Sequence, residues 1–197
     1  MASVYVITGP SGVGKGTVIR ALLERLPQLE LSVSATTRAP RPDEVDGVHY
    51  WFLTEDEFDR RLRAGDFLEH AQYAGARYGT LKSEVERRAA HGRPVVLEIE
   101  VQGARQIRHA MPEAVQVFLA PPSLDTLRAR LRARGTDSDE EVERRLRVAT
   151  EELEAKDEFA HVVCNDDLER AVDELASIVE GAIGAADTLQ GNDFSPH

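Results

Sequence analysis

The stretch Gly9-Pro10-Ser11-Gly12-Val13-Gly14-Lys15-Gly16-Thr17 decides the fold of this chain. An apolar, β-rich run at residues 4–7 precedes it, and a helical pattern with apolar positions between 18 and 26 follows it. Strand, glycine loop, lysine and helix in this order cradle nucleotide phosphates, because backbone N–H groups and the helix N-terminus converge on an anion. Lys15 is then expected to reach the terminal phosphates as a point charge.

The loop departs from the common phosphate-binding pattern at one position. Gly9, Gly14 and Lys15 match G-x-x-x-x-G-K, but Gly16 stands where Ser or Thr usually follows the lysine. The hydroxyl comes one residue later, at Thr17. We therefore expect a phosphate cradle that lacks the usual protein ligand for magnesium. A glycine-rich turn without a ligand is the alternative, which the agreement of loop, lysine and flanking elements disfavours.

Composition narrows the choice of partners. The 197 residues suit one core with insertions, and the 35 acidic residues against 24 basic ones give a net charge of −11. This charge opposes binding to nucleic acid or acidic membranes, so an anionic ligand must be held by local clusters of arginine. A single cysteine, Cys164, and the lack of an apolar spanning run or signal peptide predict a cytoplasmic protein.

Strand-like and helical runs alternate along the chain. The strands are expected at 4–8, 31–34, 95–99, 115–119 and 161–164, with helices between most of them. This alternation predicts an α/β fold with a parallel five-stranded sheet flanked by helices. Residues 34–81 indicate a small mixed, mostly antiparallel insert with one helix near 55–64. Residues 124–157 indicate a helical segment broken at 135–137 and capped by Asp137 or Ser138, and 186–197 a disordered tail.

Four arginines alternate along the first helix of the segment 124–157, namely Arg128, Arg130, Arg132 and Arg134. Residues two apart lie on opposite flanks of a helix, so Arg128 and Arg132 share one flank. Arg130 and Arg134 share the other, and Arg145 borders the apolar stripe of the next helix. A solvated, salt-bridged hairpin and a cluster converging on a phosphate chain are both open interpretations.

Two further groups suit a nucleotide site. Glu98 and Glu100 alternate at the carboxyl end of a predicted parallel strand, where open α/β sheets bind ligands. The stretch 34–41 joins hydroxyl groups to Arg38 and Arg41, which suits a phosphate monoester with phenols such as Tyr50 or Tyr78. Solvent-exposed strand ends and ordinary turns are the alternatives to these interpretations.

Together these residues resemble the guanylate kinase family, whose members phosphorylate GMP with ATP. The landmarks occur in order at 9–17, 34–41, 44–47, 67–69, 78–80, 98–103, 134–136 and 165–168. The resemblance implies a P-loop core at 1–33, 82–123 and 158–185, a GMP-binding lobe at 34–81 and a lid at 124–157. It also implies Mg²⁺ as a cofactor, and small-molecule substrates for a monomer or homodimer.

The resemblance implies a role for each matching residue. The GMP phosphate is expected to contact Arg38, Arg41, Tyr50 and Tyr78. The guanine base is expected to contact Ser34, Glu69 and Thr80, with Glu98 and Glu100 near the metal and GMP. ATP is expected to bind the loop Gly9, Pro10, Ser11, Gly12, Val13, Gly14, Lys15, Gly16 and Thr17, and Asn165. Catalysis is expected from Lys15, Arg38, Arg130, Arg134 and Arg145.

Departures from the family pattern leave the metal ligands open. Besides Gly16, Thr80 stands where Ser is common and Glu100 where Asp is usual. Mg²⁺ is therefore expected to rely on phosphates and water, with Thr17, Glu98 or Glu100 as candidate ligands. Two other functions are possible for such a sequence, a catalytically silent domain that binds phosphopeptides and a P-loop kinase for another small molecule. The retained lysine and arginines disfavour the first, and the base-reading residues disfavour the second.

Overall fold

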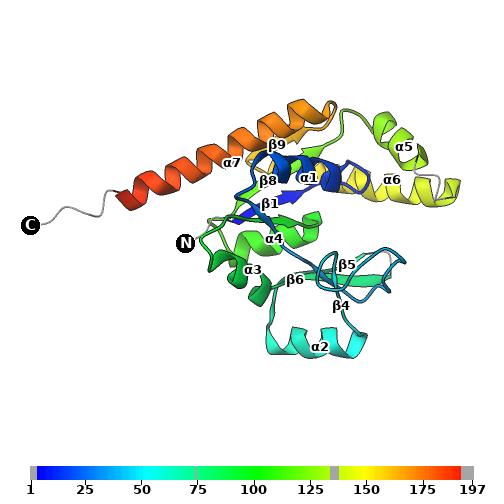
Figure 1. The fold of residues 1–197 in the computed structure, drawn as a ribbon. Helices are drawn as coiled ribbons and strands as arrows, with labels where there is room; N and C mark the ends of the chain where they lie inside the picture. The colour runs from blue at the N-terminus through cyan, green and yellow to red at the C-terminus, as the bar shows by residue number, and fades with distance from the viewer. Residues whose placement is uncertain (1–3, 74, 134–137, 192–197) are drawn as a thin grey trace, which may run out of the picture. The chain divides into compact units, whose positions relative to one another are not determined.

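The computed structural model describes residues 4–73, 75–133 and 138–191, the last seven of these by their backbone alone (Figure 1). Its main sheet has the strand order β2-β7-β1-β8-β9. A second sheet has the order β4-β3-β6-β5. The α/β fold predicted from the sequence, with a five-stranded parallel sheet and a small mixed insert, is confirmed.

The strands of the main sheet are β1 (Val4–Thr8), β2 (Glu30–Leu31), β7 (Val95–Glu98), β8 (Val115–Ala120) and β9 (His161–Cys164). β7 pairs in parallel with β1 and β2, and β8 pairs in parallel with β9. Strand β1 is buried along its whole length and β7 in its first three residues. Burial on both faces explains why these strands are continuous apolar runs without alternation.

Contacts divide the chain into two compact units. Unit 1 contains residues 4–8 and 28–116, and unit 2 contains 9–27 and 117–191, as far as the chain is described. The segment 34–81 therefore falls within unit 1 and the segment 124–157 within unit 2.

The second sheet belongs to unit 1. Its strands are β3 (Ala35–Thr36), β4 (Trp51–Phe52), β5 (Phe67–Tyr73) and β6 (Ala76–Leu81). β6 is antiparallel to β3 and β5, whereas β3 and β4 are parallel. Helix α2 (Glu55–Ala64), cyan in Figure 1, packs Phe58 against Phe67 with ring centroids 4.5 Å apart. The Thr54 side chain caps this helix by accepting a hydrogen bond from Glu57 N, so the predicted helix has a local cause.

Two helices of unit 1 follow its strands directly. Helix α3 (Lys82–Ala89) continues from β6 and contacts both β6 and β7. Helix α4 (Val101–Ala110) follows β7 and contacts β1 and β5. Both helices are therefore placed beside strands that carry predicted site residues.

Helices make up most of unit 2. Helix α1 (Lys15–Arg25) contacts α7 (Leu168–Gly191), which also contacts β9. Helices α5 (Leu124–Ala133) and α6 (Asp139–Glu154) pack against each other through a cluster of Leu127, Leu131, Val142, Leu146 and Ala149. A 3₁₀ turn, η1 (Ala155–Glu158), follows α6.

Ser138 caps α6 by accepting a hydrogen bond from Glu141 N, which confirms one of the two caps expected from the sequence. The predicted break at 135–137 and the alternative cap Asp137 lie outside the described residues.

Two sequence-based expectations need correction. The strand expected at 31–34 is interrupted, because β2 ends at Leu31 and β3 begins at Ala35. The N–H group of Val33, between these strands, donates to the side chain of Glu84 and not to a strand. The tail expected to be disordered from residue 186 is helical as far as Gly191. Extending an existing helix adds one hydrogen bond for each residue that is fixed, whereas starting a new helix is costly, and Ala186, Leu189 and Gln190 are good helix formers.

Candidate active site

Glycines with positive φ shape the phosphate loop of unit 2. Gly9 has φ 145°, and a Cβ atom there would lie 2.2 Å from the carbonyl oxygen of Leu119. Gly14 is the N-cap of α1 with φ 101°, in the left-handed region that favours glycine. Gly14 has no side chain to cap the helix, and α1 has no acidic residue in its first turn. No side-chain cap or first-turn carboxylate therefore offsets the positive dipole end of α1, which favours an anion there.

Lys15 is held inside this loop. Its side chain is 8% exposed, and its Nζ donates a hydrogen bond to Gly9 O at 2.6 Å. In the same loop, Ser11 N donates to a carboxylate oxygen of Glu152 at 3.3 Å. The loop therefore holds a fixed cation beside an amide that already binds an anionic oxygen.

Arg130 and Asn165 hold the phosphate loop from outside. Arg130 donates to Val13 O at 3.0 Å and to Asn165 O at 2.8 Å. The Asn165 side-chain amide also donates to Val13 O, at 2.8 Å. Because two donors bind one carbonyl, the backbone conformation at Val13 is fixed next to the glycines.

The arginines of α5 divide between two flanks, as the sequence predicted. Arg128 pairs with Glu143 at 3.3 Å and Arg132 with Asp139 at 3.7 Å, so this flank is a salt-bridged hairpin. Arg130 lies on the other flank and turns to the phosphate loop. Arg145 on α6 lies 3.6 Å from Glu141. Arg134 lies outside the described residues.

Unit 1 contains a cavity of about 230 Å³. Six of the predicted site residues line it, namely Ser34, Tyr50, Glu69, Tyr78, Glu98 and Glu100. The sequence interpretation did not select the other lining residues, Leu31, Ser32, His49, Ala71, Tyr73, Gly79 and Ile99. The alternation of Ser32 with Ser34 was a signal that both face one side. The Ser32 hydroxyl is buried without a hydrogen-bond partner among the residues that the structure describes.

Glu69 on β5 is the most buried acidic group of this cavity. It is 4% exposed, and the Thr80 hydroxyl on β6 donates to its Oε1 at 2.7 Å. Desolvation raises the pKa of Glu69 from 4.5 to about 7, against the opposing effect of the Thr80 hydrogen bond. Gly103 on α4 makes room for the carboxylate, because a Cβ atom there would lie 2.4 Å from Glu69 Oε2.

A cationic and phenolic group lies beside β3 and β6. Arg38 donates to a Glu44 carboxylate oxygen at 2.8 Å, and its guanidinium carbon lies 5.3 Å from the centroid of the Tyr50 ring. Tyr50 and Tyr78 meet edge to face at 6.1 Å. The Arg38 hydrogen bond lowers the pKa of Glu44 to about 2, and burial raises the pKa of Tyr50. The Arg41 side chain is 75% exposed and lies 3.9 Å from Glu44.

The candidate metal ligands are divided between the two units. The part of the chain that the structure describes contains no group of three or more His, Cys, Asp or Glu able to hold a metal ion. Thr17 is exposed on α1, and Glu98 and Glu100 line the cavity. The same described residues form no helix that is long and apolar enough to cross a membrane.

The parallel sheet, the strained glycine loop and its buried lysine define a P-loop protein that binds nucleotide phosphates. Comparison with known proteins gives the family. The family model of guanylate kinase matches residues 1–182. The chain is 55% identical over 170 residues to a guanylate kinase of Synechococcus sp. (strain CC9311), covering 86% of this chain and 90% of that protein.

A second relative and a solved structure agree. A guanylate kinase of Rubrobacter xylanophilus is 51% identical over 182 residues, which is 92% of this chain and 95% of that protein. The crystal structure of guanylate kinase from Anaplasma phagocytophilum superposes with a TM-score of 0.75 at 31% identity, over 91% of this chain and 85% of that one. The chain belongs to the guanylate kinase family, and its function is that of a guanylate kinase.

Proposed function

We propose that the cavity of unit 1 binds GMP with its base against Glu69. The buried Glu69–Thr80 pair carries this assignment. Guanine presents two adjacent donors, N1–H and the 2-amino group, and an ionised carboxylate accepts both. Adenine lacks this pair of donors and would leave a desolvated carboxylate without compensation. Ser32 and Ser34 add hydroxyl groups that line the same cavity.

The GMP phosphate is assigned to Arg38, Arg41, Tyr50 and Tyr78. Arg38 supports this because Glu44 and the Tyr50 ring already hold its guanidinium. A preoriented guanidinium binds a phosphate with less loss of side-chain entropy. The exposed guanidinium of Arg41 is free to turn toward a ligand, at a cost limited to a weak surface ion pair with Glu44.

The P-loop of unit 2 is assigned to the phosphates of ATP, with Lys15 beside the terminal groups and Asn165 toward the adenine. In the reaction, an oxygen of the GMP phosphate forms a bond to the γ-phosphorus, and the bond from that phosphorus to the β–γ bridging oxygen breaks. The attacking group is already an oxyanion, so no strong base is required. Lys15, Arg130, Arg134 and Arg145 are proposed to neutralise the charge of the transferring group.

Mg²⁺ is proposed as the cofactor, bound mainly through phosphates and water. Thr17, Glu98 and Glu100 offer hard oxygen atoms, the ligand type that Mg²⁺ prefers. When bound, Mg²⁺ supplies charge neutralisation. Closure of the segments 34–81 and 124–157 is proposed to exclude water, since ATP would otherwise be hydrolysed.

A coupled assay with ATP and a panel of nucleoside and sugar monophosphates tests this proposal. We expect turnover with GMP and little with AMP. Turnover that requires added Mg²⁺ would support the cofactor assignment, and titrating GMP in the absence of ATP separates acceptor binding from transfer. Equal turnover of AMP and GMP would contradict the base assignment. Light scattering of the purified chain distinguishes the monomer and homodimer left open by the sequence, and cell fractionation tests the predicted cytoplasmic location.

A further inference from the structure

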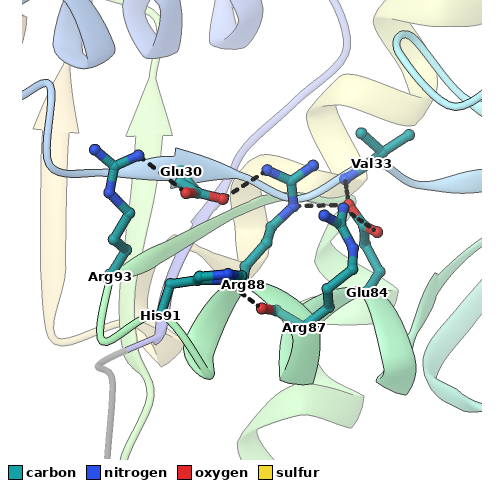
Figure 2. Close-up of polar contacts among 7 residues, drawn as sticks. All are labelled: Glu30, Val33, Glu84, Arg87, Arg88, His91 and Arg93. Carbon is teal, nitrogen blue, oxygen red and sulfur yellow. Dashed lines mark hydrogen bonds and ion pairs between the residues drawn. The ribbon is translucent and has the colours of Figure 1, made fainter.

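The backbone between two cavity-lining serines is held by a side chain from outside the cavity. Ser32 and Ser34 line the cavity, and Val33 lies between them where β2 has ended and β3 has not begun. Val33 N donates to Glu84 Oε1 at 3.3 Å, across 51 positions of the sequence (Figure 2). This segment therefore depends on a carboxylate of α3 for a hydrogen bond that a strand neighbour would ordinarily supply.

Arginines fix Glu84 in turn. Glu84 is 3% exposed, and Arg88 Nε donates to the same Oε1 at 2.7 Å while Arg87 donates to Oε2 at 3.0 Å. Arg88 also donates to Glu30 Oε2 on β2 at 2.9 Å, so it bridges the two carboxylates, as Figure 2 shows. The arginine hydrogen bonds lower the pKa of Glu84 against the opposing effect of burial.

The network joins both ends of one short segment to one helix. Arg88 holds Glu30 at the start of β2, and Glu84 holds Val33 three residues later. Helix α3 itself follows β6, which carries Tyr78 of the cavity and Thr80, the hydrogen-bond partner of Glu69. Helix α3 is thus connected to the cavity in two ways, by its hydrogen bonds to the segment 30–33 and by its direct continuation from β6. Arg93, which pairs with Glu30 at 3.0 Å, extends the network to the surface without reaching Val33.

We propose that Glu84, fixed by Arg88, is a positioning residue for the base-binding wall of the cavity. It keeps the Ser32–Ser34 segment at the distance from Glu69 that a guanine base requires. This inference rests on the proposed function, because it takes the cavity as the GMP site. Removal of Glu84 is expected to weaken GMP binding because Glu84 holds Val33 between two serines that line the cavity. ATP binding is expected to stay intact because the phosphate loop belongs to unit 2.

Glu84→Ala tests the proposal directly, with GMP and ATP dissociation constants measured separately by calorimetry. We expect the Kd for GMP to rise about tenfold or more, the loss expected for a hydrogen bond to a charged acceptor. The Kd for ATP and the kcat at saturating GMP are expected to stay within about twofold of wild type. Glu84→Gln keeps an oxygen for Val33 N–H and is expected to recover part of the GMP affinity.

Arg88→Lys is a second route to the same result if Glu84→Ala fails to fold. It keeps the charge near Glu84 but loses the two-pronged bridge to Glu30, so a smaller rise in the GMP Kd is expected. Arg93→Ala is the matched control, since it breaks a pair with Glu30 and leaves Val33 and Glu84 connected. It is expected to bind GMP like wild type.

A stability control separates positioning from general weakening of unit 1. Ile107 is fully buried in α4, and Ile107→Val is expected to lower the thermal midpoint without moving the wall. If Ile107→Val lowers the thermal midpoint as much as Glu84→Ala does and also raises the GMP Kd as much, the inference is overturned. So would wild-type GMP affinity in a folded Glu84→Ala protein. Ser34→Ala binding GMP like wild type would instead overturn the assignment of the cavity on which the inference rests.

Discussion

The Thr80 hydroxyl donates a hydrogen bond to the buried carboxylate of Glu69, with Oγ1 and Oε1 2.7 Å apart. The two residues are opposite each other in the register of β5 and β6, so the sheet itself sets this distance. Thr80 occupies one lone pair of the carboxylate and leaves the others for a ligand. The pair therefore orients an acceptor group toward the place that the proposed function assigns to the guanine base.

Glu69→Gln is expected to reduce the preference for GMP over AMP. Glutamine keeps the shape of the side chain but turns one acceptor into a donor that faces a guanine donor. The kcat/KM for GMP should fall by about tenfold to a thousandfold, whereas that for AMP should hardly change. Kinetics of both monophosphates in wild type and variant measure this ratio. An unchanged ratio would mean that another residue reads the base.

The raised pKa of Glu69 predicts a pH dependence of stability. Between pH 4.5 and about 7 the folded chain holds a proton on Glu69 that the unfolded chain has lost. The stabilising contribution of protonated Glu69 to the free energy of unfolding is therefore fully present below pH 4.5. It is lost as the pH rises through about 7. Glutamine does not titrate, so wild type should lose thermal stability relative to Glu69→Gln as the pH rises. In ligand-free protein, the thermal midpoint of the variant minus that of wild type should therefore increase from pH 5 to pH 8. A flat difference would indicate an ordinary pKa.

Gly103→Ala is expected to weaken GMP binding strongly. The added methyl group would lie 2.4 Å from Glu69 Oε2 and would displace the carboxylate from its place beside Thr80. We expect the KM for GMP to rise about tenfold or more while the KM for ATP is retained. Gly181→Ala is the matched control, because this helical glycine of α7 has open space around it. Equal effects of the two substitutions on GMP would contradict the steric argument.

Lys15→Ala should abolish most turnover and spare GMP binding. The ammonium is fixed at 2.6 Å from Gly9 O in the phosphate loop and is expected to stabilise charge that grows in the transition state. The kcat should fall by about a thousandfold, with near wild-type GMP affinity in calorimetry. Near-normal turnover would contradict the assignment of the loop to ATP.

Arg130→Ala should affect ATP more than Arg128→Ala does. Arg130 donates to Val13 O in the phosphate loop, whereas Arg128 pairs with Glu143 on the opposite flank of the helical hairpin. We expect kcat/KM for ATP to fall at least about tenfold in the first variant and less than about twofold in the second. Thermal midpoints of both proteins serve as the folding control. Similar kinetics in the two variants would mean that the contact with Val13 has no bearing on ATP.

Local patterns in the sequence were enough to predict the phosphate loop, four of the five strands of the main sheet and helix α2, and they limited the cap of α6 to Asp137 or Ser138. Each of these depends on residues within a few positions, through periodicity, capping or the freedom of glycine. Local patterns also selected Tyr50, Tyr78, Glu98 and Glu100, and the family resemblance added Glu69 and a role for each residue. Together with Ser34, these residues line one cavity.

Other features depended on packing between distant segments. No local pattern indicates that Glu84 binds the backbone of Val33, that Gly103 makes room for Glu69, or that Arg130 donates to Val13. The strand expected at 31–34 is interrupted for the same reason, since a carboxylate from α3 takes the hydrogen bond that β pairing would use. Such contacts are set by how strands and helices pack, and packing is decided by side chains far apart in the chain.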